Sequence, residues 1–446
     1  MLDRAQKKGI WGWMLFDWAS QPYNTLLITF IFAPYFTSAV VGDPAQGQAV
    51  WGYTVGISGL IIAVLAPILG AYSDRTGPRK PWIFLFSAMY VAGSFALWWA
   101  VPGMENYTWI LIFFAIGLIG MEFATIFTNA YLPELGPEDE VGRLSGNGWA
   151  LGYVGGLITL VVMLLLLAEN PEGKTMLGTP PMFGLDPETR EGTRSVGPLT
   201  AIWYVIFIIP FFLWVKDTPK RKDATVAITS GLSEVWQTLK SLPKKKSLFA
   251  YLGASLFYRD GLNGIYTFGG IYAGGVLGWS VVEIGIFAIL AIISGALFAW
   301  LGGKADHAMG PKPVILASIY VLIAVVLLIV MVDRDSVLFM PVGPESSLPD
   351  ITFYICGIII GAAGGTIQSA SRTMMVRQAE PGKMTEAFGL YALSGKATAW
   401  LAPLAIAVVT DISNSQSIGV TPILVLFILG LILLAWVSPT GDAKKT

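Results

Sequence analysis

The feature that most constrains this sequence is a series of twelve apolar stretches separated by polar segments. A transmembrane helix needs about 20 apolar residues to cross a bilayer core of about 30 Å. Hydrophobic residues make up 54% of the chain and charged residues only 13%, whereas a soluble domain typically carries about 25% charged residues. We therefore predict an all-α membrane protein with twelve transmembrane helices, near residues 10–41, 51–73, 82–101, 107–131, 147–168, 197–215, 248–277, 281–301, 313–332, 351–371, 386–411 and 419–438.

The distribution of lysine and arginine predicts which side of the membrane each loop faces. With the N-terminus inside, 22 of the 28 Lys and Arg residues fall in inner segments, 4 in outer loops and 2 within helices. Because positive residues concentrate on the cytoplasmic side, we expect an inner (plasma) membrane protein with both termini in the cytoplasm. The first apolar stretch is too long for a signal-peptide core, so we interpret it as an uncleaved helix.

The second half of the chain repeats features of the first half. At an offset of 243 residues the matched pairs are Asp17 and Asp260, Tyr23 and Tyr266, Gly146 and Gly389, and Gly152 and Gly395. Asp74 and Asp306 match at an offset of 232. The repeat predicts two pseudo-symmetric six-helix bundles, over residues 1–215 and 248–446, joined by a cytoplasmic linker over 216–247 that contains an amphipathic helix. Parallel repeats of this kind place a substrate near the bilayer midplane.

One segment of each half resembles the signature loop of the major facilitator superfamily. The first is Gly70-Ala-Tyr-Ser-Asp74-Arg75-Thr-Gly77-Pro-Arg79-Lys80, although Pro78 stands where a basic residue is usual, and the weaker copy starts at Gly302 and contains Asp306. An aspartate at a helix end can pair with a facing helix N-terminus in one conformation only. The resemblance therefore implies gating roles for Gly70, Asp74, Arg75, Gly77, Arg79, Gly302 and Asp306.

Longer motifs resemble one branch of that superfamily, the vacuolar-effluxer-like or "unknown major facilitator" family. They are Phe16-Asp17-Trp18-Ala19, Asn129-Ala-Tyr-Leu-Pro-Glu134 leading to Gly142-Arg-Leu-Ser-Gly146, Tyr258-Arg-Asp260-Gly261, and Gln368-Ser-Ala-Ser-Arg372 leading to Glu386-Ala-Phe-Gly-Leu-Tyr391. The branch includes the autophagy-related vacuolar amino-acid effluxer. The resemblance covers nearly the whole chain outside residues 169–196, and it implies the major facilitator fold and a transport role, with amino-acid efflux as the specific expectation.

Five charged residues lie within predicted transmembrane helices: Asp17, Glu122, Arg259, Asp260 and Lys396. A charge at the bilayer centre costs at least about 2.5–3.5 kcal/mol, so such residues are expected to face a partner or a water-filled cavity. The third, sixth, ninth and twelfth helices carry no charge in their cores. In major facilitators those four are the outer supports, which agrees with this distribution.

Helical spacing groups polar side chains with these charges. Residues three, four or seven positions apart share a helix face, as do Asp17, Gln21 and Asn24, and likewise Gln368 and Arg372. The candidate substrate- or ion-binding residues are therefore Asp17, Gln21, Tyr23, Asn24, Glu122, Asn129, Arg259, Asp260, Asn263, Tyr266, Gln368, Arg372 and Lys396.

Each of these assignments has an alternative. Asp17 and Asp260 are either functional or structural partners of Lys396 or Arg259. Glu122 has no basic neighbour on its own helix, which favours a proton-titrated site. Arg372 belongs either to the substrate site or to the inner gate.

Three local features give further expectations. Pro22 in the first helix, and Gly261 with Gly264 in the seventh, are expected to weaken those helices at matching places. The glycines at 148, 152 and 156 of the fifth helix are expected to pack onto the eighth helix at Ala291 and Gly295. In the linker, an apolar stripe along the amphipathic helix is expected to lie on the membrane surface. Its residues are Leu232, Val235, Trp236, Leu239 and Leu242.

Together these features predict a secondary transporter of a small polar solute, an amino acid or similar metabolite, working by alternating access and coupled to protons. One histidine and one cysteine argue against a metal site, a catalytic constellation or an enzyme, and we expect no cofactor. The net charge of −1 gives no basic field for nucleic acid. Expected partners are a small-molecule substrate, protons and membrane lipid, with the chain a monomer. The alternatives are a sugar–cation symporter and a non-transporting membrane receptor or scaffold.

Overall fold

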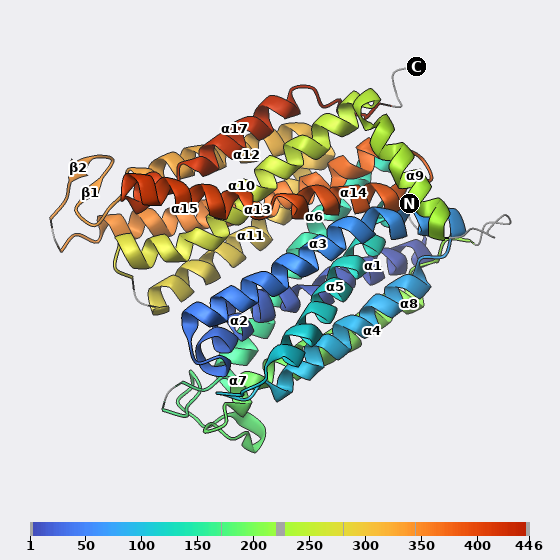
Figure 1. Ribbon diagram of the computed structural model, residues 1–446. Coiled ribbons are helices and arrows are strands. Elements are labelled where there is room, and N and C mark those ends of the chain that lie inside the picture. Colours follow the sequence, from blue (N-terminus) through green and yellow to red (C-terminus); the bar gives the residue numbers. More distant parts are fainter. Residues whose placement is uncertain (1–2, 171, 220–227, 280, 344, 443–446) are drawn as a thin grey trace. The chain divides into compact units, whose positions relative to one another are not determined.

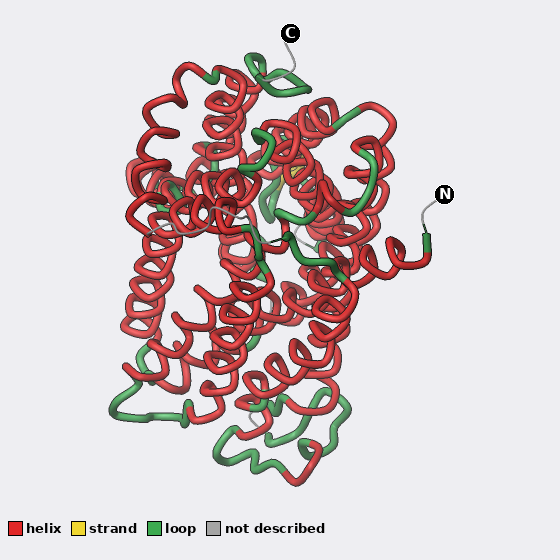
Figure 2. The backbone as a smooth tube through the Cα atoms, turned by 90° about the vertical axis from the view of Figure 1, so that its right-hand side faces the viewer, coloured by secondary structure: helices red, strands yellow, loops and turns green. Residues whose placement is uncertain are grey.

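The structure is a computed structural model that describes residues 3–170, 172–219, 228–279, 281–343 and 345–442. Figure 2 shows that helices account for most of the backbone. The long helical elements (Figure 1) are α1 Arg4–Pro22, α3 Pro44–Thr76, α4 Lys80–Ala96, α5 Thr108–Asn129, α6 Val141–Val162, α8 Val196–Trp214, α9 Ile228–Ser241, α10 Lys246–Val276, α11 Val281–Met309, α12 Pro311–Val330, α13 Leu348–Gln378, α14 Met384–Ala397, α15 Leu401–Ser413 and α17 Pro422–Leu434.

Every predicted transmembrane stretch coincides with helix. Among the described residues, eleven helical segments are long and apolar enough to cross a membrane. The remaining predicted span, 248–277, is α10. At 31 residues it is about 46 Å long, but it carries Arg259 and Asp260 and falls outside the apolar set. The chain is therefore an integral membrane protein.

The chain divides into two compact units, each described by itself. Unit 1 comprises Met1–Ala66, Arg75–Tyr131 and Leu151–Val226, and unit 2 comprises Pro67–Asp74, Leu132–Ala150 and Ala227–Thr446. Unit 2 thus holds short parts of α3 and α6 together with the helices from α9 onward. Residues 220–227 of the predicted linker lie outside the described residues.

The first helix changes from α-helical to π-helical hydrogen bonding at Pro22. α1 ends at Pro22, followed by the π-helical segment η1 Tyr23–Phe30, the short helix α2 Phe32–Tyr35 and the π-helical segment η2 Phe36–Val40. The matching expectation for the seventh helix is wrong, because α10 runs without a break past Gly261 and Gly264. The second half is interrupted instead in the eleventh predicted span, where α14 ends at Ala397 and α15 begins at Leu401.

Two contacts recur at matched positions and support the internal repeat. In unit 1 the Tyr23 hydroxyl lies 2.7 Å from the position that a Cβ on Gly117 would occupy, and in unit 2 the Tyr266 hydroxyl lies against the equivalent position on Gly364. Lys80 Nζ donates to the Phe212 carbonyl at 2.7 Å, and its counterpart Lys312 donates to the Val437 carbonyl at 2.7 Å. Each half therefore uses the same devices to hold its helices together.

The glycines of the fifth helix pack differently from the expectation. A Cβ on Gly152 would meet Asp17 at 3.3 Å, and one on Gly156 would meet Thr25 Oγ1 at 2.5 Å, so these glycines face α1 in unit 1. In unit 2, Gly146 packs on the Gly303 backbone of α11, the eighth predicted span. Ala291 and Gly295, the expected partners, contact Gly361 and Gly365 of α13. The first part of α6 reaches the eighth helix, but not through the predicted residues.

The long loop over residues 169–196 is tightly packed at its base. The Glu169 side chain is fully buried, accepts hydrogen bonds from the Thr193 hydroxyl (2.7 Å) and backbone amide (3.1 Å), and pairs with Arg190 Nε at 2.8 Å. Arg194 donates to the Trp98 carbonyl at 2.7 Å. The loop also contains the one-turn helix α7 Glu191–Arg194.

Three smaller features complete the described chain. A two-residue hairpin pairs β1 Ser336–Val337 with β2 Met340–Pro341, and α16 Gln416–Gly419 precedes α17. In α9, Val235 and Leu242 just beyond it are 7% exposed, whereas Trp236 is 60% exposed. The chain's one cysteine, Cys356, is a buried free thiol in α13.

Candidate functional site

Asp260 is buried at the interruption between α14 and α15. The residue is 2% exposed, and its Oδ2 accepts a hydrogen bond from the Ala402 amide at 3.1 Å. In the first turn of α15, the Leu401 amide donates to the Thr398 carbonyl at 2.7 Å, and the Leu404 amide to the Trp400 carbonyl at 3.1 Å. Pro403 has no N–H. Asp260 therefore pairs the one amide of this turn that lacks a local acceptor, and acts as the cap of α15.

Arg259 lies beside α14 and forms no ion pair with Asp260 in the described structure. Its Nη1 donates to the Tyr391 carbonyl at 2.8 Å, and its guanidinium stands 4.1 Å from the centre of the Tyr391 ring. A Cβ on Gly395 would lie 2.6 Å from the guanidinium carbon, so glycine makes room for the cation there. Of the structural alternatives for Asp260, pairing with Arg259 is thus wrong.

The matched aspartate of the first half has other surroundings. Asp17 is half-buried in α1, beside Gly152 of the unbroken helix α6. Gln21, one turn further, packs on Gly156, while Asn24 Nδ2 lies 4.0 Å from Met121 Sδ. These three polar residues therefore line the surface of α1 and η1 that faces α5 and α6.

Tyr23 is held within unit 1. It is fully buried, its hydroxyl donates to the Phe114 carbonyl at 2.8 Å, and its ring lies 5.1 Å from that of Tyr90. This hydrogen bond uses the hydroxyl proton. Tyr266, by contrast, is 46% exposed on α10.

The remaining candidates lie on separate helices. Glu122 and Asn129 of α5 and Gln368 of α13 are half-buried, as is Lys396 near the end of α14, whereas Asn263 of α10 is exposed. Glu122, Asn129, Gln368 and Lys396 all have interaction partners. Among the described residues, no group of three or more His, Cys, Asp and Glu could hold a metal ion.

Asp74, a predicted gating residue, caps the helix α14 within unit 2. Its two carboxylate oxygens accept hydrogen bonds from the backbone amides of Thr385 (3.1 Å) and Glu386 (2.9 Å). Gly70, one turn earlier in α3, lies so close that a Cβ would meet the Thr385 carbonyl carbon at 2.7 Å. We call the Asp74 contacts with Thr385 and Glu386 the latch.

Arg372 lies among neighbouring contacts of unit 2 that join α13 to α6. Its Nε donates to Ser145 Oγ at 2.9 Å and its Nη2 to the Ser145 carbonyl at 2.7 Å. The guanidinium is 5.7 Å from the centre of the Trp149 ring. These bonds place Arg372 with the contacts that join α13 to α6.

The second copy of the loop has a different arrangement from the first. Asp306 is fully buried, and its carboxylate caps no backbone amide among the described residues but interacts with the Thr373 hydroxyl and the Arg377 guanidinium. Its side chain lies 2.5 Å from where a Cβ on Gly142 would be, so only glycine fits there. Gly302 likewise faces Thr366 of α13.

An aspartate that the sequence analysis missed organises the corresponding end of unit 1. Asp217 Oδ1 accepts hydrogen bonds from the Tyr131 hydroxyl (2.6 Å) and from the amides of Arg79 (2.9 Å) and Lys80 (3.3 Å). Arg79 itself is buried and donates to the Ala130 carbonyl. Asp442, which caps α10 through the Ser247 and Leu248 amides, stands 225 residues later. This third repeat offset could have revealed both aspartates.

The two other gating candidates lie at the end of α3. Arg75 is half-buried in the last turn and has a partner. Gly77 follows with φ of 101°, a backbone conformation that favours glycine. It ends the helix and turns the chain into α4.

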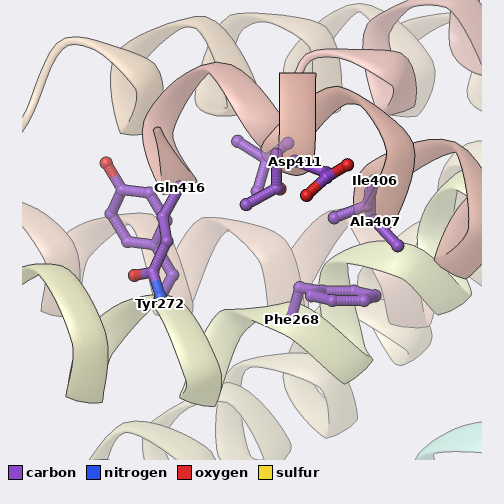
Figure 3. A pocket seen from close by; sticks show the side chains of 8 residues that line it. Phe268, Tyr272, Ile406, Ala407, Asp411 and Gln416 are labelled. Carbon is purple, nitrogen blue, oxygen red and sulfur yellow. The ribbon is translucent and has the colours of Figure 1, made fainter. Parts of the chain in front are cut away.

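A cavity of about 310 Å³ lies in unit 2 between α10 and α15. Figure 3 shows Phe268 and Tyr272 of α10 on one side and Ile406, Ala407 and Asp411 of α15 on the other. Among the described residues, the Asp411 carboxylate has no hydrogen-bond or ion-pair partner, and it is exposed. In the loop before α13, Arg334 Nη1 donates to both carboxylate oxygens of Asp350, in the first turn of that helix, at 2.9 and 2.8 Å. These bonds raise the pKa of the Arg334 guanidinium above its usual value.

Comparisons with known proteins agree with this architecture. The family model described as "Vacuole effluxer Atg22 like" matches residues 39–445. An uncharacterized MFS-type transporter of Bacillus subtilis, YxiO, is 29% identical over 433 residues, which cover 96% of this chain and 94% of that protein. Autophagy-related protein 22-1 of Neosartorya fischeri is 22% identical over 286 residues, which cover 60% of this chain and 43% of the fungal protein.

A solved structure gives the same fold. The crystal structure of the human organic anion transporter MFSD10 (TETRAN) superposes with a TM-score of 0.69 at 17% identity, and the match covers 97% of this chain and 99% of that one. This likeness confirms the predicted twelve-helix major facilitator fold. Together with the family match over residues 39–445, it shows that the chain belongs to the vacuole effluxer Atg22-like family of major facilitator transporters.

Proposed function

We propose that this transporter moves a small polar solute, an amino acid or similar metabolite, by alternating access, and that a proton gradient drives it. The observation that carries the proposal is the set of ionisable groups on membrane helices: Asp17 and Glu122 in the first half, and Arg259 and Asp260 in the second. Such groups are costly in hydrocarbon and typically mark a substrate or ion pathway.

Arg259 and Asp260 support a substrate that carries both charges. The Arg259 guanidinium has five N–H donors, of which the structure engages Nη1 with the Tyr391 carbonyl. A carboxylate of the substrate would complete its hydrogen bonding. Asp260 and the half-buried Asp17 supply negative charge for an ammonium group. Tyr266, Asn263 and Gln368 remain proposed as polar walls of the site.

The latch supports alternating access. Asp74 at the end of α3 bonds two backbone amides at the start of α14. These bonds can exist only while α3 and α14 lie together, so they favour one conformation over another. We place this latch and both chain termini on the cytoplasmic side of the plasma membrane. We further propose that the protein acts as a monomer and that the exposed face of α9 lies on the lipid surface.

Transport by purified protein in proteoliposomes tests the proposal. Vesicles with an imposed pH gradient are loaded with amino acids, and sugars serve as the competing substrate class. We expect amino-acid flux that follows the gradient, collapses with a protonophore and falls in Asp17→Asn and Glu122→Gln. Flux that ignores the pH gradient would rule out proton coupling, and sodium-dependent sugar flux would favour a sugar–cation symporter. Complete absence of flux, with cysteines beside Asp17 labelled from one side only, would indicate a receptor or scaffold.

A further inference from the structure

Two buried polar oxygen atoms at the interruption between α14 and α15 have no partner among the described residues. They are Asp260 Oδ1 and Thr398 Oγ1. Buried polar atoms in native structures nearly always have a hydrogen-bond partner, and each exception calls for an explanation such as a bound ion or water. In a membrane protein the cost of leaving them unpaired is greater, because the hydrocarbon offers no substitute.

A third oxygen at the same place lacks its normal partner. In a continuous helix the Ala399 carbonyl would accept a hydrogen bond from residue 403, but that residue is Pro403, which has no N–H. No other described residue donates to this carbonyl. The three residues between α14 and α15, Thr398 to Trp400, therefore bring a hydroxyl and a carbonyl oxygen to the helix end that Asp260 caps.

The cavity between α10 and α15 begins close to these atoms. Its lining residue Ile406 is four positions beyond Ala402, which is about 6 Å along the helix. The exposed carboxylate of Asp411 lies one further turn along α15 and lines the same cavity (Figure 3). A volume of about 310 Å³ holds several water molecules, each of which occupies about 30 Å³ in the liquid. The cavity therefore places space for water about one turn along α15 from the Ala402 amide that Asp260 pairs, with the Asp411 carboxylate farther along the same helix.

The surrounding charges leave the Asp260 carboxylate available. Arg259 directs its guanidinium onto the Tyr391 ring and carbonyl, and Lys396 of α14 has a partner. Asp260 Oδ2 is occupied by the Ala402 amide, which leaves Oδ1 as the free negative atom. Interrupted membrane helices coordinate sodium or protons with such freed oxygens in other transporters.

From this geometry we propose that Asp260 Oδ1, Thr398 Oγ1 and the Ala399 carbonyl bind a small monovalent cation, either sodium or a proton, at the interruption of the eleventh helix. Oxygen atoms are the ligands that hard cations prefer. This inference deepens the proposed function by naming where the coupling ion binds. The bound cation would fix the start of α15 through Asp260, so its arrival and departure would change the stability of that half-helix.

The test measures binding without transport. Purified full-length protein is followed by thermal unfolding and by hydrogen exchange of peptides that cover residues 396–413, in sodium chloride and in choline chloride, at several pH values. For a sodium site we expect the unfolding midpoint to rise by about 1.5 °C when sodium is tenfold above its dissociation constant, with slower exchange at Leu401 and Ala402. For a proton site, we expect a lower pH, and not sodium, to raise the unfolding midpoint and to slow the exchange at Leu401 and Ala402.

Two variants and one matched control assign the response. Asp260→Asn retains an acceptor for the Ala402 amide but loses the charge, so it should fold and lose the response to the cation. Thr398→Val removes only the hydroxyl and should weaken the sodium response several-fold. Thr200→Val, which likewise removes a buried hydroxyl but from α8 in unit 1, should keep the response. If wild type and Asp260→Asn respond alike to sodium and to pH, the site does not exist. If binding is present but proteoliposomes show no flux, the proposed transport function fails while the site stands.

Discussion

The two halves of this molecule place a matched aspartate in different surroundings. Asp17 lies half-buried against Gly152 of α6, a helix that continues past it. Asp260 is almost fully buried and caps α15, the second piece of a divided helix. The two aspartates stand 243 residues apart, and at the same offset Pro403 replaces Leu160. A single substitution in a duplicated sequence, leucine to proline, can therefore accompany the change from a continuous helix to a helix end.

The largest expected effect comes from carrying that proline into the first half. Leu160 is 3% exposed within α6, so Leu160→Pro removes a helical hydrogen bond and should cost about 3 kcal/mol or more of unfolding free energy. Pro403→Leu should change stability by less than about 1 kcal/mol, because Pro403 stands in the first turn of α15, where proline is tolerated. Denaturant unfolding of the purified variants measures both. Equal losses of unfolding free energy in Leu160→Pro and Pro403→Leu would contradict the view that only the second half has a divided helix at this position.

A second contrast concerns the loops. Glu169→Ala leaves Arg190 without its buried partner and should lower the free energy of unfolding by about 2–3 kcal/mol. The loss is smaller than for a fully buried pair because Arg190 is about a third exposed. Arg334→Gln breaks an exposed pair with Asp350, and exposed pairs contribute little. Thermal unfolding midpoints of the two variants test this difference, and Glu169→Gln, which loses only the charge, is measured as a control. The comparison is overturned if Arg334→Gln destabilises as much as Glu169→Ala.

The two loop aspartates should also differ. Asp74→Ala removes the cap on two α14 amides and should cost about 1–2 kcal/mol, whereas Asp74→Asn retains one acceptor and should cost less. Asp306→Ala removes a buried carboxylate that interacts with Thr373 and Arg377 but caps no backbone amide among the described residues, so it should cost less than Asp74→Ala. Unfolding midpoints measured side by side give the order. A larger loss for Asp306→Ala than for Asp74→Ala would contradict this order.

The smallest expected effect concerns a contact that the two halves have in common. Lys80 and Lys312 each donate to a carbonyl at 2.7 Å, so Lys80→Met and Lys312→Met should each cost about 1 kcal/mol. The two losses should be equal within about 0.5 kcal/mol and should add in the double variant, because the sites share no partners. Unequal losses would sharpen the contrast between the halves.

The sequence predicted the helices well because apolar length is a strong and local signal. All twelve stretches lie in helical segments, and Pro22 marks the change from α-helix to π-helix in the first. The interruption in the eleventh helix was missed, since Pro403 lies within an apolar stretch and its effect depends on Asp260, 143 residues earlier. Gly261 and Gly264 did not break α10, because the packed bundle supports the helix around them.

The site residues were less predictable, because helical spacing gives a face but not its neighbour. Asp260, Arg259 and Arg372 were identified as important, yet each of them bonds a backbone atom, at Ala402, Tyr391 and Ser145 respectively. Backbone partners carry no sequence signal. Asp217 was missed because its three contacts come from segments that only the fold brings together.

The buried Cys356 has a practical consequence for labelling studies. It is the chain's one thiol, and it is completely enclosed in α13. Since a maleimide must reach a thiolate to react, the wild-type protein should remain unmodified while folded. Engineered cysteines can therefore report water access, spin-label distances or fluorescence transfer directly, without first building a thiol-free background.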